Sequence, residues 1–282
     1  MASKTKAIHK RHPFAKGSNH MTRRFHWADY KTTEYETIDP QRTIAVLPTA
    51  AIEQHGPHLP VGVDTMINQG MLDTLCARVP DDLDIRLLPI QAVGKSNEHI
   101  RAPGTLTLPA EVTIQMWVEI GLSVARAGVR KMAIMNSHGG NLDIISIVSR
   151  ELRVGANMLA GKCQWGAFGY PEGMYSADEL KFGIHGGDVE TSLMLHFRPE
   201  LVDMAKAKNF RSSAENLPED ARLRPTGPTS YGWIASDLNP DGTVGNASNA
   251  TAEKGRLTAE HQADGAIRFL QDIADTDITL FD

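Results

Sequence analysis

The segment Thr43-Ile-Ala-Val-Leu-Pro48 runs directly into Thr-Ala-Ala-Ile-Glu53-Gln-His55-Gly-Pro-His58-Leu-Pro-Val-Gly-Val-Asp64. The first part is short and apolar, so it predicts a buried β-strand. The second part is a polar loop rich in Gly and Pro. Beyond it, apolar residues recur every four positions and predict a helix over residues 64–79: Ile67, Met71, Leu75 and Val79. The stretch therefore predicts a strand, a polar loop and a helix in succession.

The same alternation continues along the chain. Further strands are expected at 85–90, 131–135 and 162–168, and further helices at 109–127, 142–159, from 190 onward and at 252–274. Strands that alternate with helices favour a mostly parallel sheet covered on both faces. The expected fold class is α/β, a three-layer α/β/α arrangement. Residues 205–250 are less regular, and we interpret them as an excursion that covers a site or reaches a neighbouring subunit.

Composition is that of an ordinary globular protein. Of 282 residues, 41% are hydrophobic and 22% are charged, and the net charge of -5 gives no reason to expect a nucleic-acid partner. No run approaches ~20 apolar residues, so no membrane-spanning helix is expected. Cys76 and Cys163 lie far apart in apolar surroundings, which favours two reduced thiols in a cytoplasmic protein.

The N-terminus has a different character. Residues 1–24 hold seven Lys and Arg and no acidic residue. The sequence Gly17-Ser-Asn-His20-Met21 resembles a cloning junction, so we interpret residues 1–20 as a cloning-derived or disordered leader. Residues 21–282 are expected to form one domain.

Acidic and imidazole side chains follow the expected strands. Glu53 and His55 follow the first strand, Glu98 and His99 the second, and His138 the third. Ligands of open α/β sheets bind beyond the carboxyl ends of the strands. Because Glu, Asp and His are the ligands that bind zinc or manganese at nitrogen and oxygen sites, a metal-dependent hydrolase is the first interpretation.

Spacing supports this interpretation without deciding it. Glu53 and His55 are two residues apart, which points both side chains to one side of an extended segment. Asp64 is expected at a helix start, where it is either a ligand or only a cap. His138 lies in the Gly-rich segment Asn136-Ser-His-Gly-Gly-Asn141, and Asn141 is expected to cap the next helix.

These segments, together with three others, resemble the creatininase (creatinine amidohydrolase) family. The others are Gly94-Lys-Ser-Asn-Glu98-His99, His185-Gly-Gly-Asp-Val-Glu190-Thr-Ser and Gly245-Asn-Ala-Ser-Asn-Ala-Thr-Ala-Glu-Lys-Gly255. They occur in family order over residues 26–275. The resemblance implies two divalent ions per subunit, zinc or manganese or both, with iron as an alternative. The metal ligands that it implies are Glu53, His55, Asp64, His138 and Glu190.

The resemblance also implies catalytic roles and an assembly. His185 matches a family active-site histidine suited to acid–base work, and Glu98 and His99 are expected to line the pocket. The family resemblance suggests a homo-oligomer, a hexamer built from dimers. No Gly-x-Ser-x-Gly elbow and no phosphate-binding glycine motif is present in the sequence, which disfavours Ser or Cys nucleophiles and phosphate-bearing cofactors.

Two positions differ from the creatinine-cleaving members that the chain resembles. Those members have Tyr-Glu after the motif histidine, and that Glu is a metal ligand in them; this chain has Gly139-Gly140. We expect Glu190 to supply the missing carboxylate, although an ordinary acidic residue of a helix start is the alternative. Where those members place a Trp that closes over creatinine, this chain has Lys181. Both differences count against creatinine as the substrate.

The expected function is hydrolysis of a C–N bond in a small, cyclic amide or amidine by a hydroxide shared between two ions. Two alternatives keep the family: hydrolysis of a C–C bond in a cyclic diketone, and removal of a formyl group from an amine. An alternative of another class is a non-catalytic metal-binding assembly protein. Its metal site would be closed, whereas five ligands over two ions leave open positions.

Overall fold

The fold is built on one parallel sheet, seen in a computed structural model that describes residues 23–281. The predicted leader, residues 1–20, lies outside the described residues. The strands are β1 (Ile44–Thr49), β2 (Ile85–Leu87), β3 (Lys131–Asn136) and β4 (Leu159–Gln164). They lie in the order β2-β1-β3-β4, and every pair is parallel. The predicted α/β class is confirmed.

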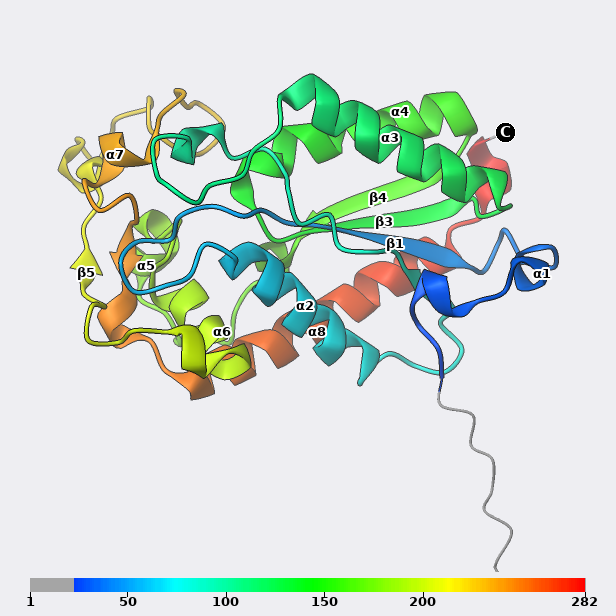
Figure 1. The fold of residues 1–282 in the computed structure, drawn as a ribbon, viewed down its shortest axis with the longest axis horizontal. Coiled ribbons are helices and arrows are strands. Elements are labelled where there is room, and N and C mark those ends of the chain that lie inside the picture. Colours follow the sequence, from blue (N-terminus) through cyan, green and yellow to red (C-terminus); the bar gives the residue numbers. More distant parts are fainter. Residues whose placement is uncertain (1–22, 282) are drawn as a thin grey trace, which may run out of the picture.

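Helices cover both faces of this sheet (Figure 1). On one face lie α3 (Ala110–Arg126) and α4 (Leu142–Ala156); on the other lie α2 (Val63–Cys76), α6 (Asp188–Phe197) and α8 (Ala252–Asp275). Alternate residues of β1 supply the two cores. Ile44 and Val46 pack in the cluster with α2 and α8, and Ala45 and Leu47 pack in the cluster with α3 and α4. All four are fully buried, as expected of a strand covered on both faces.

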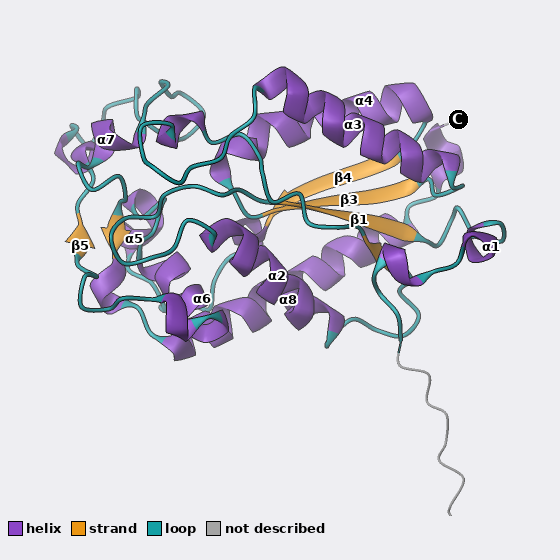
Figure 2. Ribbon diagram, in the orientation of Figure 1, coloured by secondary structure: helices purple, strands orange, loops and turns teal. Residues whose placement is uncertain are grey.

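The remaining elements are short. They include α1 (Thr32–Tyr35), α5 (Ala177–Phe182) and α7 (Ala235–Leu238), and a two-stranded antiparallel sheet of β5 (Asn209–Phe210) and β6 (Gly245–Asn246). Figure 2 shows that α5, α7, β5 and their long loops gather beyond one end of the parallel sheet. That end is the carboxyl end of the strands, opposite α1 and the C-terminus. Among the described residues, no helix is long and apolar enough to cross a membrane.

Several boundaries differ from the sequence prediction. The helix predicted over residues 142–159 ends at Ala156, and Asn157 follows in the left-handed conformation with φ 53°. This is a common way for a helix to stop, because Asn tolerates that conformation. The next strand starts at Leu159 instead of residue 162. The expected end of that strand is a 3-10 turn, Trp165–Phe168, whose Trp165 indole donates to Asn68 Oδ1 at 3.3 Å.

The strand order creates a crevice. The chain passes from β1 to β2 on one side and then returns to β3 on the other side of β1. The loops after β1 and β3 therefore diverge at a topological switch point, where open α/β sheets bind their ligands. The loop after β1 carries Glu53 and His55, and the loop after β3 carries His138.

Candidate metal centre

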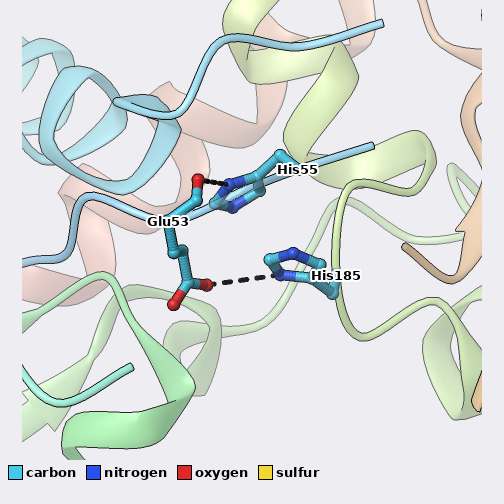
Figure 3. Close-up of side chains that lie close together, drawn as sticks. All are labelled: Glu53, His55 and His185. Carbon is cyan, nitrogen blue, oxygen red and sulfur yellow. Dashed lines mark hydrogen bonds and ion pairs between the residues drawn. The ribbon is translucent and has the colours of Figure 1, made fainter. Parts of the chain in front are cut away.

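The loop after β1 brings a carboxylate and an imidazole into the crevice. Glu53 and His55 are each only 1% exposed. The Nδ1 atom of His55 lies 3.0 Å from the backbone oxygen of Glu53. Because a carbonyl oxygen can only accept a hydrogen bond, Nδ1 carries the proton and Nε2 is left with a lone pair. Figure 3 shows the two side chains, with the Glu53 carboxylate turned toward His185.

Asp64 lies between two imidazoles. It belongs to the first turn of α2, whose N-cap is Gly62, so Asp64 is not the cap. Its Oδ1 lies 3.8 Å from Nε2 of His55, and its Oδ2 lies 3.4 Å from Nδ1 of His138. One carboxylate thus faces two different rings with its two oxygens, which is the arrangement needed to bridge two ions.

His138 follows β3 and repeats the pattern of His55. Its Nε2 donates to the backbone oxygen of Lys95 at 2.9 Å, so in the neutral ring Nδ1 would carry the lone pair. That Nδ1 lies 3.3 Å from Oε1 of Glu53. Histidines that bind metals usually donate their other ring N–H to a carbonyl or carboxylate, which fixes the ring and its tautomer.

His185 lies in the loop before α6 and is oriented in the same way. Its Nε2 donates to the backbone oxygen of Gln54 at 2.6 Å, and its Nδ1 lies 3.5 Å from Oε1 of Glu53. The backbone of His185 also pairs with Val244, which ties this loop to the excursion. The ring is therefore fixed by its own hydrogen bond and by the backbone pairing of its loop. Its unprotonated Nδ1 is directed at the Glu53 carboxylate.

Glu190 enters from the first turn of α6. Its Oε2 accepts a hydrogen bond from the Gly186 backbone at 2.6 Å and lies 3.7 Å from Nε2 of His55. Asp188, two residues earlier in the same turn, makes its contacts elsewhere. Its carboxylate accepts from Lys254 Nζ at 2.6 Å and from Ser192 Oγ at 3.0 Å. Of the two acids in this motif, only Glu190 reaches the cluster.

Glu98 and His99 lie together in a 3-10 turn, Asn97–His99. The Nδ1 atom of His99 accepts from the Gln54 side-chain amide at 2.8 Å, so Nε2 carries the proton and lies 3.4 Å from Glu53 Oε1. Glu98 Oε1 lies 3.6 Å from Nε2 of His138. His99 is thus arranged as a donor to Glu53, unlike His55 and His185.

Several buried atoms of the cluster have no hydrogen-bond partner. They include Oε2 of Glu53, Nε2 of His55 and Oδ2 of Asp64. A buried polar atom left unpaired costs on the order of 1–3 kcal/mol. These three residues all belong to the possible metal groups described below, so their unpaired atoms indicate that a further group, such as a metal ion, is bound here.

Electrostatics lead to the same conclusion. Burial, reinforced by the charge of Glu53, raises the pKa of Asp64 well above its usual range, and burial also raises the pKa of Glu190. Burial lowers the pKa of His55 and of His185 to about 4, so both rings are neutral at pH 7. Neutral imidazoles are in the state that binds a metal cation, and a bound cation would favour the ionised form of the two carboxyl groups.

His138 is the exception among these rings. Burial opposes its charge, but the carboxylates of Glu53, Asp64 and Glu98 raise its pKa to about 10. A proton on Nδ1 would then lie between two carboxylates. The charged ring supplies the positive charge that a divalent ion would otherwise bring to this position.

Ligand atoms gather into three groups of the size that holds a metal ion. They are Glu53, His55 and His185; Glu53, Glu98 and His138; and His55, Asp64 and Glu190. Every residue that the sequence analysis assigned to the metals or to catalysis belongs to one of these groups or, for His99, contacts one. The donor set consists of carboxylate oxygens and imidazole nitrogens, which suits zinc or manganese.

Comparison with known proteins identifies the family. The creatininase family, described as creatinine amidohydrolase, matches residues 28–270. This chain belongs to the creatininase family. Mycofactocin precursor peptide peptidase of Mycobacterium ulcerans is 31% identical over 229 residues, covering 79% of this chain and 82% of that protein. Creatinine amidohydrolase of Pseudomonas putida is 27% identical over 248 residues, covering 80% of this chain and 88% of that protein.

Solved creatininases share the fold. One described as creatininase Mn superposes with a TM-score of 0.70 at 25% identity, covering 90% of this chain and all of that one. The predicted family and the predicted three-layer creatininase fold are confirmed. The chain is an enzyme, a creatininase-family amidohydrolase, rather than a non-catalytic assembly protein.

Gly140 marks the main difference between this creatininase-family chain and the creatinine-cleaving members that it resembles. A Cβ atom at Gly140 would fall on the Lys95 backbone oxygen, the Glu98 carboxylate and the His138 ring. The carboxylate beside Gly140 is therefore that of Glu98. Glu190, which the sequence analysis expected to supply the missing carboxylate, lies in the group with His55 and Asp64.

We predict that Gly140→Ala weakens metal binding. The added methyl group would displace the hydrogen bond from His138 to Lys95, and loss of such a supporting contact typically costs about 10- to 100-fold in metal affinity or activity. Gly139→Ala is the matched control, because a Cβ there meets nothing within 4 Å. Zinc titration of both variants measures the difference. Equal affinities would show that the turn tolerates a side chain.

Sequence reasoning missed Glu179, a buried residue that supports the centre. Its carboxylate accepts from the backbone N–H groups of Asp188 and Asn246, each at 2.7 Å. It therefore ties the start of α6, which carries Glu190, to β6. In the sequence, Glu179 is only an acidic residue in the short helix before the His185 motif. An acidic residue at such a position ordinarily indicates no more than a helix cap.

Asn141 has another role than the predicted one. It makes no side-chain cap. Its amide donates to the Ala50 backbone oxygen at 3.0 Å, and its carbonyl accepts from the Lys95 backbone at 3.0 Å. Asn141 thus joins the loops that follow β1, β2 and β3. These are contacts between distant segments, which a local capping pattern does not reveal.

Proposed function

We propose that this chain hydrolyses a C–N bond of a small amide at a centre of two divalent metal ions. The observation that carries the proposal is the position of Asp64, whose two oxygens face Nε2 of His55 and Nδ1 of His138. One ion position would be held by His55, Asp64 and Glu190, and the other by Asp64, Glu53 and His138. Zinc or manganese fits this donor set.

The ions, when bound, would activate a water molecule and polarise the scissile carbonyl. Side chains of the protein would transfer the protons. His185 has its Nε2 proton fixed on the Gln54 carbonyl, so its Nδ1 is free to take a proton from the attacking water and pass it to the leaving nitrogen. Glu98 lies beside His138 and on the wall of a cavity, where it would meet the substrate.

The substrate that we propose is a cyclic amide or amidine other than creatinine. Lys181, at the position where creatinine-cleaving members have a Trp, is exposed and lines a small pocket away from the metal ligands. A peptide bond is the second candidate, because the mycobacterial relatives at 31% identity are named peptidases. We further propose a cytoplasmic homo-oligomer, a hexamer built from dimers.

A substrate panel tests this proposal. We expect the zinc- or manganese-loaded protein to hydrolyse a lactam, a cyclic ureide, a formamide or a short peptide, and to turn over creatinine slowly or not at all. Turnover of cyclic diketones alone would replace C–N hydrolysis by C–C hydrolysis. Rapid creatinine turnover would contradict the role given to Lys181 and Gly139-Gly140.

A further inference from the structure

A cavity of about 180 Å³ adjoins the metal centre. One wall is the turn at residues 98–102, and the other is the excursion at residues 234–242. Gln54 joins the two walls, because its side-chain amide contacts both His99 Nδ1 and the Gly242 backbone oxygen. His99 in turn lies 3.4 Å from Glu53, so the cavity opens directly beside the cluster.

Charge is unevenly distributed around this cavity. Glu98 lies on the side nearest His138, and Arg101, one turn later, is exposed. The acid on the opposite wall, Asp241, is already paired with Lys208 at 2.8 Å. Within residues 23–281, Arg101 makes no side-chain hydrogen bond or ion pair. The cavity therefore carries one cation whose charge no neighbour neutralises.

We propose that this cavity binds the substrate and that Arg101 holds a carboxylate group of it. A guanidinium group can bind a carboxylate through two parallel hydrogen bonds. Glu98 repels an anion from the inner end, so the carboxylate is directed outward and the neutral amide faces the centre. The apolar side chains of Ile234, Ala235 and Pro240 suit the body of such a molecule. The proposal rests on the proposed function and adds the substrate class: an amide that bears a carboxylate.

Paired probes test the proposal. N-acetylglycine and N-acetylglycinamide share one amide and differ in whether the far end is a carboxylate. By calorimetry we expect the zinc-loaded protein to bind the carboxylate probe about tenfold more tightly, as a charged hydrogen bond would provide. Arg101→Gln should abolish the preference. Arg78→Gln should keep it, because Arg78 is an exposed residue paired with Asp264 and lies outside the cavity.

The same titrations on chelator-treated protein separate this proposal from the proposed function. A carboxylate can bind a metal ion directly, so a preference that depends on zinc and not on Arg101 would overturn the role of Arg101. Equal binding of the two probes, or binding of neither, would also overturn it. A preference that depends on Arg101 and persists without metal supports it, even if hydrolysis is never found. Far-UV circular dichroism shows whether the Arg101→Gln variant is folded.

Discussion

Asp64→Asn is expected to lose both metal ions and nearly all hydrolytic activity. The two oxygens of Asp64 face different imidazoles at 3.8 and 3.4 Å, so its charge would serve both ion positions. Asparagine keeps the shape but has one neutral oxygen and an amide that cannot coordinate in the same way. Elemental analysis after gel filtration should find far fewer than the two ions per subunit that we expect of the unmodified protein.

Glu98→Gln is the matched control for Asp64. This substitution also removes a partly buried carboxylate beside His138, yet Glu98 lies on the cavity wall and faces only that one ring. We expect this variant to keep more metal than Asp64→Asn while losing activity. Equal metal contents in the two variants would show that Asp64 does not bridge, or that Glu98 is itself a ligand.

Glu190→Gln is expected to lose about one metal ion per subunit and most of the activity. The glutamine oxygen can still accept from the Gly186 backbone, as Glu190 does at 2.6 Å, so the start of α6 should stay intact. What is lost is the negative charge that faces His55. One ion position would then keep only His55 and Asp64.

Glu200→Gln is the control for Glu190, because Glu200 is exposed and pairs only with Arg198 among the described residues. Its metal content should equal that of the unmodified protein. If Glu190→Gln retains two ions, the missing ligand is not Glu190. Asp188 is a poor substitute, since Lys254 and Ser192 already occupy its carboxylate.

Much of the fold and the centre could be predicted from the sequence. The short apolar segment at residues 43–48 and the four-residue repeat after Asp64 are local patterns, and they correspond to β1 and α2. Polar residues directly after strands are also local, and parallel strands bring them to one edge. The order of strands then places Glu53, His55 and His138 together.

Other features depend on contacts between distant segments. Glu179 supports the start of α6 and β6 together, and Asn141 joins three loops, so neither role follows from sequence neighbours. The tautomers of His55, His138 and His185 depend on which carbonyl each ring meets. The position of Glu98 beside Gly140 likewise required the fold, because Glu98 follows β2 and Gly140 follows β3.

The most direct test of the central claim is metal content measured together with turnover. The protein is dialysed exhaustively against a chelator, assayed on the best amide of the panel, and then titrated with zinc or manganese. We predict no turnover without metal and full recovery as two ions per subunit are bound. Full activity in protein shown by elemental analysis to contain no metal would contradict the account.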